Sequence, residues 1–487
     1  MVFRPLQHPP ADRGTDNNTP CDVMRLQNVL PIVIGKIVSS ASKLFHLGAG
    51  ATWPGEIALR LSPNIFAEFA SQLRKGIILV AGTNGKTTTS LMITQVLEKQ
   101  GLTVVHNASG ANLLNGIVSA CIQKAAWSGK LRVDYGVFEV DENSLPQIIF
   151  YVNNSHSREP FEAQDRRGNP ENDKTGSPIG SGMTRQIVLV LLNLFRDQLD
   201  RYGEVDVIAE KWKKALLRLD TGNQTIKPYQ LIANADDPLI VHLASSASRA
   251  GLEARVTYFG LNDASQFQKK MEHATDSTFC PACGARLIYE GYYYSHIGVW
   301  KCEKCKAKRP TLDVSDWDYP LPGLYNRYNT LAAVTTSQAL GIKKETIKKA
   351  LLSFKPAFGR QEELVVNGKR VKLFLSKNPA GFNESLRTVI QLGAKQILFV
   401  LNDRIPDGRD VSWIWDVDFE MIPGNISVAV SGDRVYDLAL RLKYAGITAN
   451  ICENLENAFD TKETLYVLPT YSAMLDVRKI LTGKKIL

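Results

Sequence analysis

The sequence predicts an α/β protein in which a doubly wound parallel sheet carries a phosphate-binding loop (P-loop) and an inserted zinc ribbon. A second, Rossmann-like α/β domain follows. Three observations predict this architecture. An apolar strand at 77–81 runs directly into a glycine-bracketed turn and a helical pattern. Short β-rich runs then alternate with helical segments, which is typical of parallel sheets. Two pairs of cysteines interrupt that alternation between 280 and 305.

The turn at 82–88 has the composition of a phosphate cradle. Gly82 and Gly85 place no Cβ in the way of an anion, and N–H groups at the start of the following helix point towards it. Lys86 can reach the terminal phosphates, and the Thr87 hydroxyl can ligate Mg²⁺. The predicted ATP-binding residues here are Gly82, Thr83, Asn84, Gly85, Lys86, Thr87 and Thr88. The alternative is a tight strand–helix turn without a ligand.

The composition is that of an ordinary globular protein. The chain has 487 residues, enough for two or three domains, and its 58 basic and 49 acidic residues leave a net charge of +9. This balance is compatible with anionic partners but identifies none. The seven cysteines are too few for a disulfide framework, no apolar run has the length of a membrane span, and the start has no signal-peptide order. We therefore expect a cytoplasmic location.

Residues 1–22 are rich in proline and polar residues, and we expect them to be disordered. Residues 23–54 form a helical segment, in which Pro31 predicts a kink or two short helices. Residues 55–356 are the predicted ATP-binding central domain, in which the polar stretch 153–182 is expected to be a mobile insertion. The predicted strands of this domain are 77–81, 103–106, 135–140, 186–192 and 231–233.

Acidic residues stand where the strand 135–140 ends. Ligands bind at the carboxyl ends of strands in open α/β sheets, so a carboxylate here could hold Mg²⁺ beside the phosphate loop. Glu139 is the predicted magnesium ligand, together with Thr87. Asp141 and Glu142 follow directly, and a solvated acidic loop is the alternative.

A second polar turn ends the strand around 231–233. Asn234, Asp236 and Asp237 are predicted nucleotide-binding residues, because a carboxylate there could accept a hydrogen bond from the ribose hydroxyls. The alternative is that this turn caps the helix that begins at Pro238.

Four cysteines lie in the segment 272–312 as two CxxC pairs. Cys280, Cys283, Cys302 and Cys305 can close a tetrahedral Zn²⁺ site, with the residues between the pairs forming a hairpin. Such a site is structural, because no ligand position stays open for a substrate. Free thiols, a disulfide, or a ribbon that contacts nucleic acid through its lysines are the alternatives.

Residues 357–487 return to alternating strands and helices and predict the second α/β domain. Its predicted strands are 371–375, 396–401, 426–430 and 465–468, and its predicted helices are 383–392, 434–443 and 473–480.

Together, these motifs resemble the Mur ligase family, which includes folylpolyglutamate synthase. The stretches that carry the resemblance are Gly82–Thr87, Asn234–Pro238, Leu321–Asn326 and Gly359–Glu362. Four further stretches narrow it to the ligase subunits of lipid II isoglutaminyl synthases. These are Asn193–Glu204, Lys377–Asn383, Leu401–Asp403 with Asp407–Asp416, and Leu468–Tyr471. The resemblance covers about residue 47 to the end.

The resemblance implies an ATP-dependent carbon–nitrogen ligase of peptidoglycan synthesis. It implies that the γ-phosphoryl group of ATP activates the α-carboxylate of D-glutamate in the lipid II stem peptide as an acyl phosphate. Ammonia then replaces the phosphate. Lys86 and Glu139 would serve this chemistry. Arg360, between the two domains, would contact phosphate when they close, and a surface salt bridge is the alternative for it.

The ammonia has to come from elsewhere, since a glutaminase needs an activated nucleophilic cysteine. Outside the ribbon the chain has Cys21, Cys121 and Cys452, none of them in such a context. The resemblance supplies a GatD-like glutamine amidotransferase as the partner in a heterodimer. It also implies that an aspartate of this chain completes the partner's Cys–His pair, and both Asp410 and Asp416 fit.

A phosphate loop already at residue 82 leaves no room for the nucleotide-sugar domain of other Mur ligases. We therefore expect lipid II as the substrate, a location at the inner face of the membrane, and no nucleic-acid partner. Two alternatives stay open. One is a Mur-type ligase that adds an amino acid to a peptidoglycan or folate-like glutamyl substrate, and the other is a zinc-ribbon NTPase that binds nucleic acid.

Overall fold

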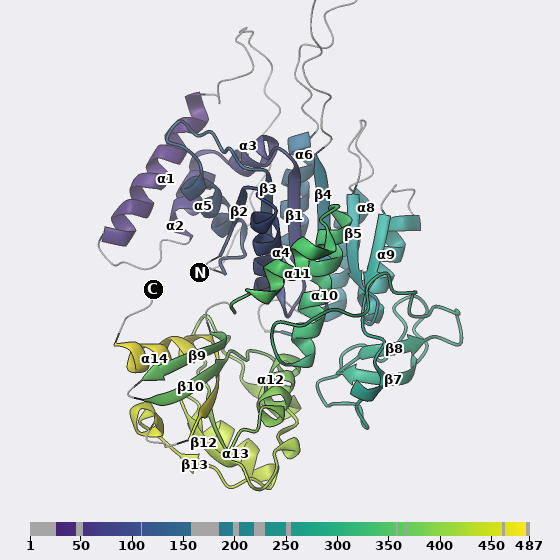
Figure 1. Cartoon of the computed structure of the whole chain (residues 1–487), viewed down its shortest axis with the longest axis vertical. Helices are drawn as coiled ribbons and strands as arrows, with labels where there is room; N and C mark the ends of the chain where they lie inside the picture. The colour runs from purple at the N-terminus through teal and green to yellow at the C-terminus, as the bar shows by residue number, and fades with distance from the viewer. Residues whose placement is uncertain are drawn as a thin grey trace, which may run out of the picture.

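The structure is a computed structural model that describes residues 26–44, 52–108, 110–156, 185–197, 204–218, 229–249, 255–356, 359–366, 368–459 and 463–483. The predicted disordered segment 1–22 lies outside the described residues. So does most of the predicted insertion 153–182, although its first residues still belong to a helix that ends at His156. A central domain lies above a C-terminal domain in Figure 1, with the cysteine ribbon at one side of the seam.

The central domain is built on a six-stranded sheet in which all strands are parallel. The order is β2-β3-β1-β4-β5-β6. The strands are β1 (Gly76–Ala81), β2 (Val104–His106), β3 (Tyr135–Val140), β4 (Gln186–Leu191), β5 (Tyr229–Asn234) and β6 (Arg255–Phe259). The first five confirm the predicted strands. The edge strand β6 was not predicted.

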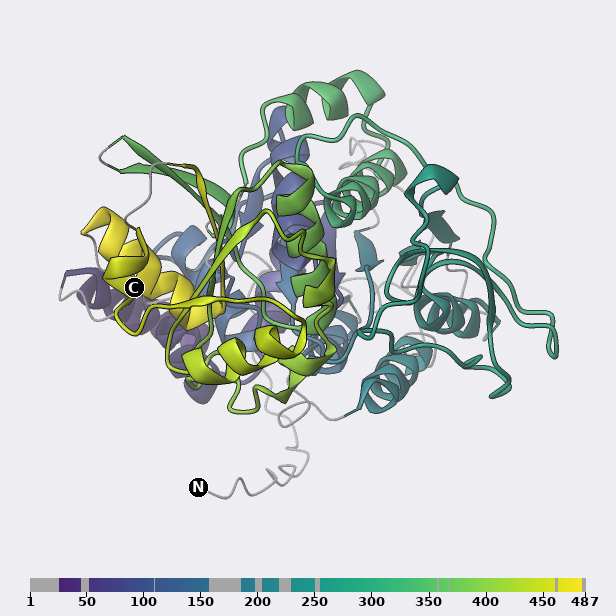
Figure 2. The ribbon, with the colours of Figure 1, turned by 90° about the horizontal axis from the view of Figure 1, so that it is seen from below.

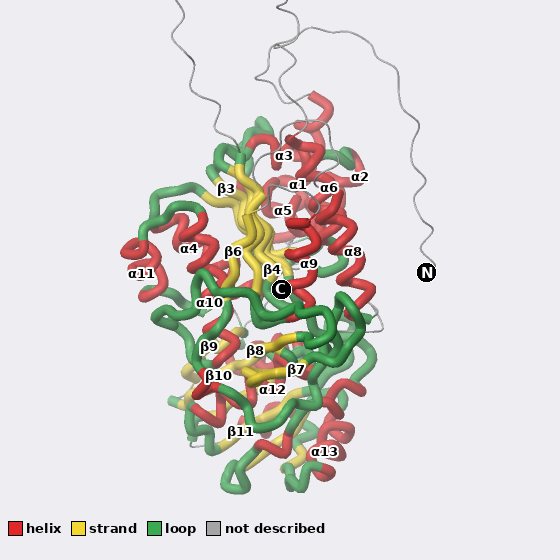
Figure 3. The backbone as a smooth tube through the Cα atoms, turned by 90° about the vertical axis from the view of Figure 1, so that its right-hand side faces the viewer, coloured by secondary structure: helices red, strands yellow, loops and turns green. Residues whose placement is uncertain are grey.

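Helices cover both faces of this sheet, as Figure 3 shows edge-on. One layer contains α4 (Lys86–Lys99), α10 (Leu324–Ala339) and α11 (Lys344–Leu352). The other contains α1 (Leu26–Leu44), α2 (Trp53–Leu61), α3 (Ile65–Gln72), α5 (Leu114–Lys124), α6 (Leu145–His156), α8 (Val205–Arg218) and α9 (Pro238–Arg249). Successive β1 side chains enter opposite cores, since Ile77 and Leu79 pack in one and Ile78 and Val80 in the other. The predicted doubly wound sheet is confirmed.

Pro31 does not divide the N-terminal segment. Residues 26–44 form the single helix α1, so the alternative of two short helices is wrong. Pro31 lies near the start of the helix, where its missing N–H removes only one hydrogen bond, to a carbonyl of the first turn.

The cysteine ribbon is a hairpin of β7 (Ile288–Tyr294) and β8 (Ile297–Lys301), as predicted. The short helix η2 (Ala264–Gln266) precedes it. Side chains of the hairpin reach the central domain: Trp300 Nε1 donates to the Ala235 carbonyl at 3.1 Å, and the Tyr293 hydroxyl donates to the Leu261 carbonyl at 2.6 Å. The ribbon is therefore attached to the end of β5 and the loop after β6.

The C-terminal domain has a second six-stranded sheet, of order β13-β12-β11-β14-β10-β9. The strands are β9 (Arg360–Val366), β10 (Lys369–Phe374), β11 (Gln396–Val400), β12 (Ser427–Ser431), β13 (Asn450–Ile451) and β14 (Leu465–Pro469). Its helices are α12 (Pro379–Gln391), η3 (Ser412–Asp416), η4 (Phe419–Met421), α13 (Val435–Tyr444), η5 (Leu455–Phe459) and α14 (Tyr471–Thr482). Only β9 runs antiparallel to its neighbour, and it was not predicted. Figure 2 shows this domain in front of the central sheet.

Candidate active site

The phosphate loop connects β1 to α4 and needs both of its glycines. Gly82 and Gly85 have φ angles of +147° and +92°, which other residues rarely adopt. A Cβ on Gly85 would lie 2.1 Å from the Asn329 Oδ1 atom, so no larger residue fits. Asn193, at the end of β4, accepts the N–H groups of Thr83 and Asn84 at 2.9 Å each. The first-turn N–H groups of α4 have no intrahelical acceptor, so they could bind an anion.

Lys86 is folded over its own loop and paired with a carboxylate. Its Nζ donates to the Gly82 carbonyl at 2.6 Å and lies 3.0 Å from Glu142 Oε1, and both side chains are buried. Burial raises the pKa of Glu142, but the charges of Lys86 and Lys377 outweigh it and leave that pKa lowered. Sequence reasoning placed Glu142 near the loop without identifying it as the partner of Lys86.

Glu139 is buried and has an oxygen without a protein partner. Asn107 fixes the backbone of Glu139 with two hydrogen bonds, of 2.9 and 3.0 Å. The Glu139 Oε2 atom has no hydrogen-bond partner among the described residues, and the side chain is 2% exposed. A buried, unpaired carboxylate oxygen is costly unless a cation compensates it. Together with the buried hydroxyl residue Thr87, this environment fits a Mg²⁺ ion.

Arg360 lies between the two domains, at the start of β9. It lines a cavity of about 70 Å³ between the phosphate loop and the C-terminal domain. The lining residues include Asn84, Thr88, Asn326, Asn329, Arg360 and Glu384. Burial lowers the pKa of the Arg360 guanidinium, while the negative charge of Glu139 acts in the opposite direction. Arg360 is half-buried, and Glu139 lies close enough to affect its pKa. This position differs from the surface salt bridge that was considered as the alternative for Arg360.

Side chains of both domains meet directly above the phosphate loop. The amides of Asn84 and Asn378 exchange two hydrogen bonds, of 3.2 and 2.9 Å. Lys377 Nζ lies 2.5 Å from Asp197 Oδ2, where Asp197 follows β4. The C-terminal domain thus contributes the cations Arg360 and Lys377 to the side of the cradle on which an anionic ligand would sit.

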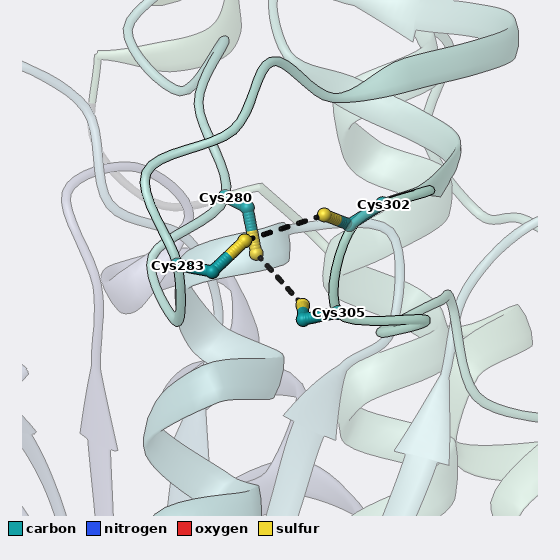
Figure 4. Close-up of side chains that lie close together, drawn as sticks. All are labelled: Cys280, Cys283, Cys302 and Cys305. Atoms are coloured by element: carbon teal, nitrogen blue, oxygen red, sulfur yellow. Dashed lines mark hydrogen bonds between the residues drawn. The ribbon is translucent and has the colours of Figure 1, made fainter.

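The four cysteines form one cluster, with all sulfur atoms within 4.8 Å of one another (Figure 4). The Sγ atoms of Cys280 and Cys305 lie 3.6 Å apart, and those of Cys283 and Cys302 lie 3.5 Å apart. Backbone N–H groups, that of Cys305 first, lower the pKa of Cys302 to about 7, while burial raises that of Cys280 to about 12. A cation at the centre would favour all four thiolates, so the cluster fits tetrahedral Zn²⁺.

Two family models match the chain. Residues 80–153 match the Mur ligase middle domain, and residues 375–474 match the MurT ligase C-terminal domain. A curated relative from Staphylococcus aureus (strain COL), named lipid II isoglutaminyl synthase (glutamine-hydrolyzing) subunit MurT, is 30% identical over 470 residues. That alignment covers 91% of this chain and 95% of the relative. The chain belongs to the MurT family. The Streptococcus pneumoniae MurT subunit is also 30% identical, over 95% of this chain and 99% of its own.

Solved structures place the MurT-family chain in the Mur ligase fold. A pseudomurein peptide ligase type C from Methanothermus fervidus is 19% identical with a TM-score of 0.57, and 84% of this chain and 79% of that one are covered. MurF from Acinetobacter baumannii is 14% identical with a TM-score of 0.53, and the match covers 88% of this chain and 80% of MurF. The resemblance to Mur ligases inferred from the motifs is therefore confirmed.

The acidic turn after β5 forms hydrogen bonds within the protein in this MurT-family structure. Asp237 caps α9 by accepting the N–H groups of Leu239 and Ile240, and its other oxygen accepts that of Leu194. Both oxygens of this fully buried carboxylate are therefore engaged within the protein. Asp237 thus acts as the helix cap that was considered as the alternative, and its role at the ribose stays a prediction.

Asp236 and Asn234 also form hydrogen bonds with other residues of the protein. Asp236 accepts hydrogen bonds from Arg309 at 2.5 Å and from the Tyr328 hydroxyl at 2.7 Å. Burial raises the pKa of Asp236 to about 6, against the opposing effect of Arg309. Asn234 donates to the Leu192 carbonyl at 2.9 Å and accepts the Asp236 N–H. Both side chains are fully buried, and their role as nucleotide ligands stays a prediction.

Asp410 and Asp416, between which the MurT-family motif did not decide, lie in different surroundings. Asp416 is half-buried and lies 3.3 Å from the Arg196 guanidinium of the central domain. Asp410 is exposed, and one of its oxygens accepts the N–H of Ser412 in the same loop. Asp416 therefore faces the seam between the domains, whereas Asp410 faces outwards. Within the described part of the chain, no helix is both long and apolar enough to cross a bilayer.

Proposed function

We propose that this chain is the ligase subunit that amidates the α-carboxylate of D-glutamate in the stem peptide of lipid II. ATP supplies the energy, and a GatD-like glutamine amidotransferase supplies ammonia. The observation that carries the proposal is identity of 30% to MurT subunits over 91–95% of the chain. The phosphate loop and its interdomain cavity support it, because they provide what an ATP-dependent ligase needs.

The reaction has two balanced steps. A carboxylate oxygen of D-glutamate bonds to the γ-phosphorus of ATP, the bond to the bridging oxygen breaks, and ADP leaves. The nitrogen of ammonia then bonds to the acyl carbon, phosphate leaves, and the nitrogen loses a proton. Charge grows on the transferred group during the first step, so catalysis depends on positioned cations and N–H donors.

Residues of both domains supply these groups in our proposal. The first-turn N–H groups of α4 and Lys86 bind the β- and γ-phosphates, with Lys86 exchanging Glu142 for a phosphate oxygen. Thr87 and Glu139 hold Mg²⁺, which neutralises the phosphate charge when bound. Arg360 and Lys377 approach from the C-terminal domain and orient the phosphoryl group and the substrate carboxylate.

Ammonia comes from the partner, because no described cysteine outside the ribbon resembles a nucleophile. Cys121 is buried, and burial raises the pKa of its thiol. The Cys452 thiol also has a raised pKa, again because of burial. An activated thiol would need the opposite shift. We assign Asp410 as the aspartate that completes the partner's Cys–His pair, because its outward position leaves it accessible to another subunit.

The remaining parts of the proposal are the setting and the role of zinc. The substrate is lipid-linked, so the enzyme works at the inner face of the membrane, and nucleic acid has no part in the reaction. Zn²⁺ in the cysteine cluster is structural, because four protein sulfurs complete its coordination.

The test is to incubate the purified chain with ATP, Mg²⁺, lipid II and ammonium and to analyse the product by mass spectrometry. We expect release of phosphate and the small mass decrease that replacing a hydroxyl by an amino group causes. Parallel reactions contain an amino acid in place of ammonium, or nucleic acid in place of lipid II. Product formation with the amino acid would identify an amino-acid-adding ligase instead, and phosphate release on nucleic acid alone would also contradict the proposal.

A further inference from the structure

Helix α1 lies on the outer flank of the central domain, with α2 and α5 between it and the sheet (Figure 1). One side of α1 is closely packed. A Cβ on Gly35 would lie 3.0 Å from Ile122 of α5 and 3.3 Å from the carbonyl of Pro54 at the start of α2. Ile32 and Ser39 are buried on the same side of the helix. This side therefore attaches α1 to the domain.

The opposite side of α1 is apolar and has no packing partner among the described residues. Leu30 and Ile37 are 62% and 56% exposed, although both are large hydrophobic residues. Val33 and Ile34 lie on the helix surface between them and are only half-buried. Successive residues of a helix are rotated by about 100°, which puts these four side chains on one outward stripe.

Two exposed tryptophans lie beside this helix. Trp53 is 68% exposed and precedes Pro54, which contacts α1 near Gly35. Trp127 follows α5 and is 59% exposed, and the Lys36 ammonium of α1 lies 5.5 Å from the centre of its ring. Tryptophan combines a large apolar ring with a polar N–H and is enriched where apolar and aqueous phases meet.

Basic residues predominate around this surface, although Glu56 and Glu98 lie near it. Residues 26–44 and 114–133 contain no aspartate or glutamate, but they include Lys36, Lys124, Lys130 and Arg132. Glu56 of α2 is the nearest acidic residue in sequence to Trp53, and its carboxylate is paired with Arg60 at 3.1 Å. A basic surface with an apolar stripe is complementary to anionic lipid headgroups above an acyl layer.

We propose that the outward stripe of α1, with Trp53, Trp127 and the lysines beside them, binds the surface of an anionic lipid bilayer. We call it the α1 surface. The stripe and the tryptophans enter the interface, while Lys36, Lys124 and Lys130 contact the headgroups. Because α1 lies on the domain through its other side, the contact is peripheral.

A groove near the α1 surface extends from Lys124 of α5 to Asn107 after β2. The groove has a volume of about 470 Å³ and is lined by Lys124, His106 and Asn107, among others. Lys124 precedes Trp127 by three residues, and Asn107 holds the backbone of Glu139. A bilayer on the α1 surface would thus present a headgroup-linked peptide near the entrance of this groove. This last step rests on the proposed function, whereas membrane binding itself does not.

The test is sedimentation of the full-length chain, alone and with its amidotransferase partner, with vesicles of phosphatidylglycerol and phosphatidylcholine or of phosphatidylcholine alone. We expect binding to the anionic vesicles that weakens as salt rises. The double variant Leu30→Ser/Ile37→Ser should bind about tenfold or more weakly, because two apolar side chains no longer enter the interface. Lys124→Glu/Lys130→Glu should weaken binding by about fivefold or more for each charge.

The matched control is Leu352→Ser on α11, which removes an apolar side chain that is 72% exposed but belongs to the other helix layer. It should bind vesicles as the wild type does. Circular dichroism and the thermal midpoint verify that each variant is folded. The proposal is overturned if the wild type does not bind anionic vesicles at low salt, or if Leu30→Ser/Ile37→Ser binds as the wild type does. Loss of self-association or of partner binding in that variant, with vesicle binding unchanged, would assign the stripe to a protein contact instead.

Activity measurements separate this inference from the proposed function. With lipid II in detergent, Leu30→Ser/Ile37→Ser should amidate at the wild-type rate, whereas with lipid II in vesicles it should be slower by about the loss in binding. A different outcome is that neither the wild type nor the variant amidates lipid II in detergent while the wild type still binds vesicles. That result would contradict the proposed function but would support membrane binding by the α1 surface.

Discussion

Lys86 and Glu142 form an ion pair in which neither side chain is more than 7% exposed. Such a pair contributes little net stability, because both charges lose their hydration. Removing one partner is different, since it leaves an uncompensated charge in the protein interior, at a cost of about 3–5 kcal/mol. Lys86, for which we propose a catalytic role, therefore also has a structural role, and a single substitution cannot separate the two.

We predict that Lys86→Met lowers ATP-dependent amidation about a hundredfold or more, because the cradle loses its cation. The same variant should lose about 3 kcal/mol of stability, because Glu142 is left unpaired. Phosphate release and denaturant unfolding measure the two effects. The double variant Lys86→Met/Glu142→Gln should regain most of the stability and none of the activity. Wild-type turnover in either variant would remove Lys86 from the mechanism.

Single residues could be predicted where the chemistry is local in sequence. Gly82 and Gly85 of the phosphate loop and the four cysteines follow from short motifs, and the structure brings each set together. Asn193 and Asn107 could not be predicted as loop supports, because they act across strands that are far apart in the chain. Asp237 was assigned to a ligand because a cap and a ribose contact require the same residue type at the same place.

Among the elements, the cysteine ribbon has the clearest separate role. Trp300 and Arg309 connect it to the fully buried turn after β5, where Arg309 neutralises Asp236. The four cysteines lie away from the phosphate loop in sequence and do not line the interdomain cavity, although Tyr294 at the end of β7 does. A defect in the ribbon should therefore act on the fold of the central domain first.

We predict that Cys302→Ser lowers the zinc content and the thermal midpoint, while the remaining folded protein amidates at the normal rate. A chelator should lower the midpoint of the wild type in the same way, because a structural zinc site contributes folding free energy. The control is Cys452→Ser, which changes a cysteine of the C-terminal domain outside the cluster. A folded Cys302→Ser protein of unchanged stability but without activity would contradict the structural role.

The three strands that were not predicted in the two large sheets, β6, β9 and β13, are edge strands. Both β6 and β9 have half-buried or exposed side chains along most of their length, so neither has the apolar run that indicates a central strand. β9 also begins with Arg360-Gln-Glu-Glu and pairs antiparallel with β10. Its place depends on backbone pairing with a neighbour, which no local pattern of hydrophobicity records.

On the scale of the whole molecule, the two domains are joined at the seam by polar contacts. Arg196 bridges Asp276 of the central domain, at 2.8 Å, and Asp416 of the C-terminal domain, at 3.3 Å. On the same seam, His273 contacts Asp418, which in turn accepts a hydrogen bond from Asn383 at 2.8 Å. Seams of this polar kind allow domains to separate and close again during turnover.

We predict opposite outcomes for the two aspartates of this region. Asp410→Asn should abolish glutamine-driven amidation but leave ammonium-driven amidation unchanged, because it acts on the partner's active site. Asp416→Asn should weaken both reactions together by a few-fold, because it loosens the contact with Arg196. Both rates are measured on the purified complex. If Asp416→Asn loses only the glutamine-driven reaction, the assignment of the two residues is reversed.

The relative position of the domains could not be predicted from the sequence. Asn84 and Asn378 are 294 residues apart, and their reciprocal hydrogen bonds depend on how two complete sheets are placed. Sequence motifs indicated only that each asparagine belongs to a family pattern. The cavity at the seam, with Arg360 beside Glu139, follows from that placement.

The pairing of Lys86 with Glu142 has a consequence for the turnover cycle. On the proposed function, Glu142 is an internal anion that holds the Lys86 ammonium group over the loop. An incoming triphosphate must compete with this internal anion for the same ammonium group. On that same proposal, Glu142 would pair with the lysine again once the terminal phosphoryl group has been transferred, which would favour the departure of ADP.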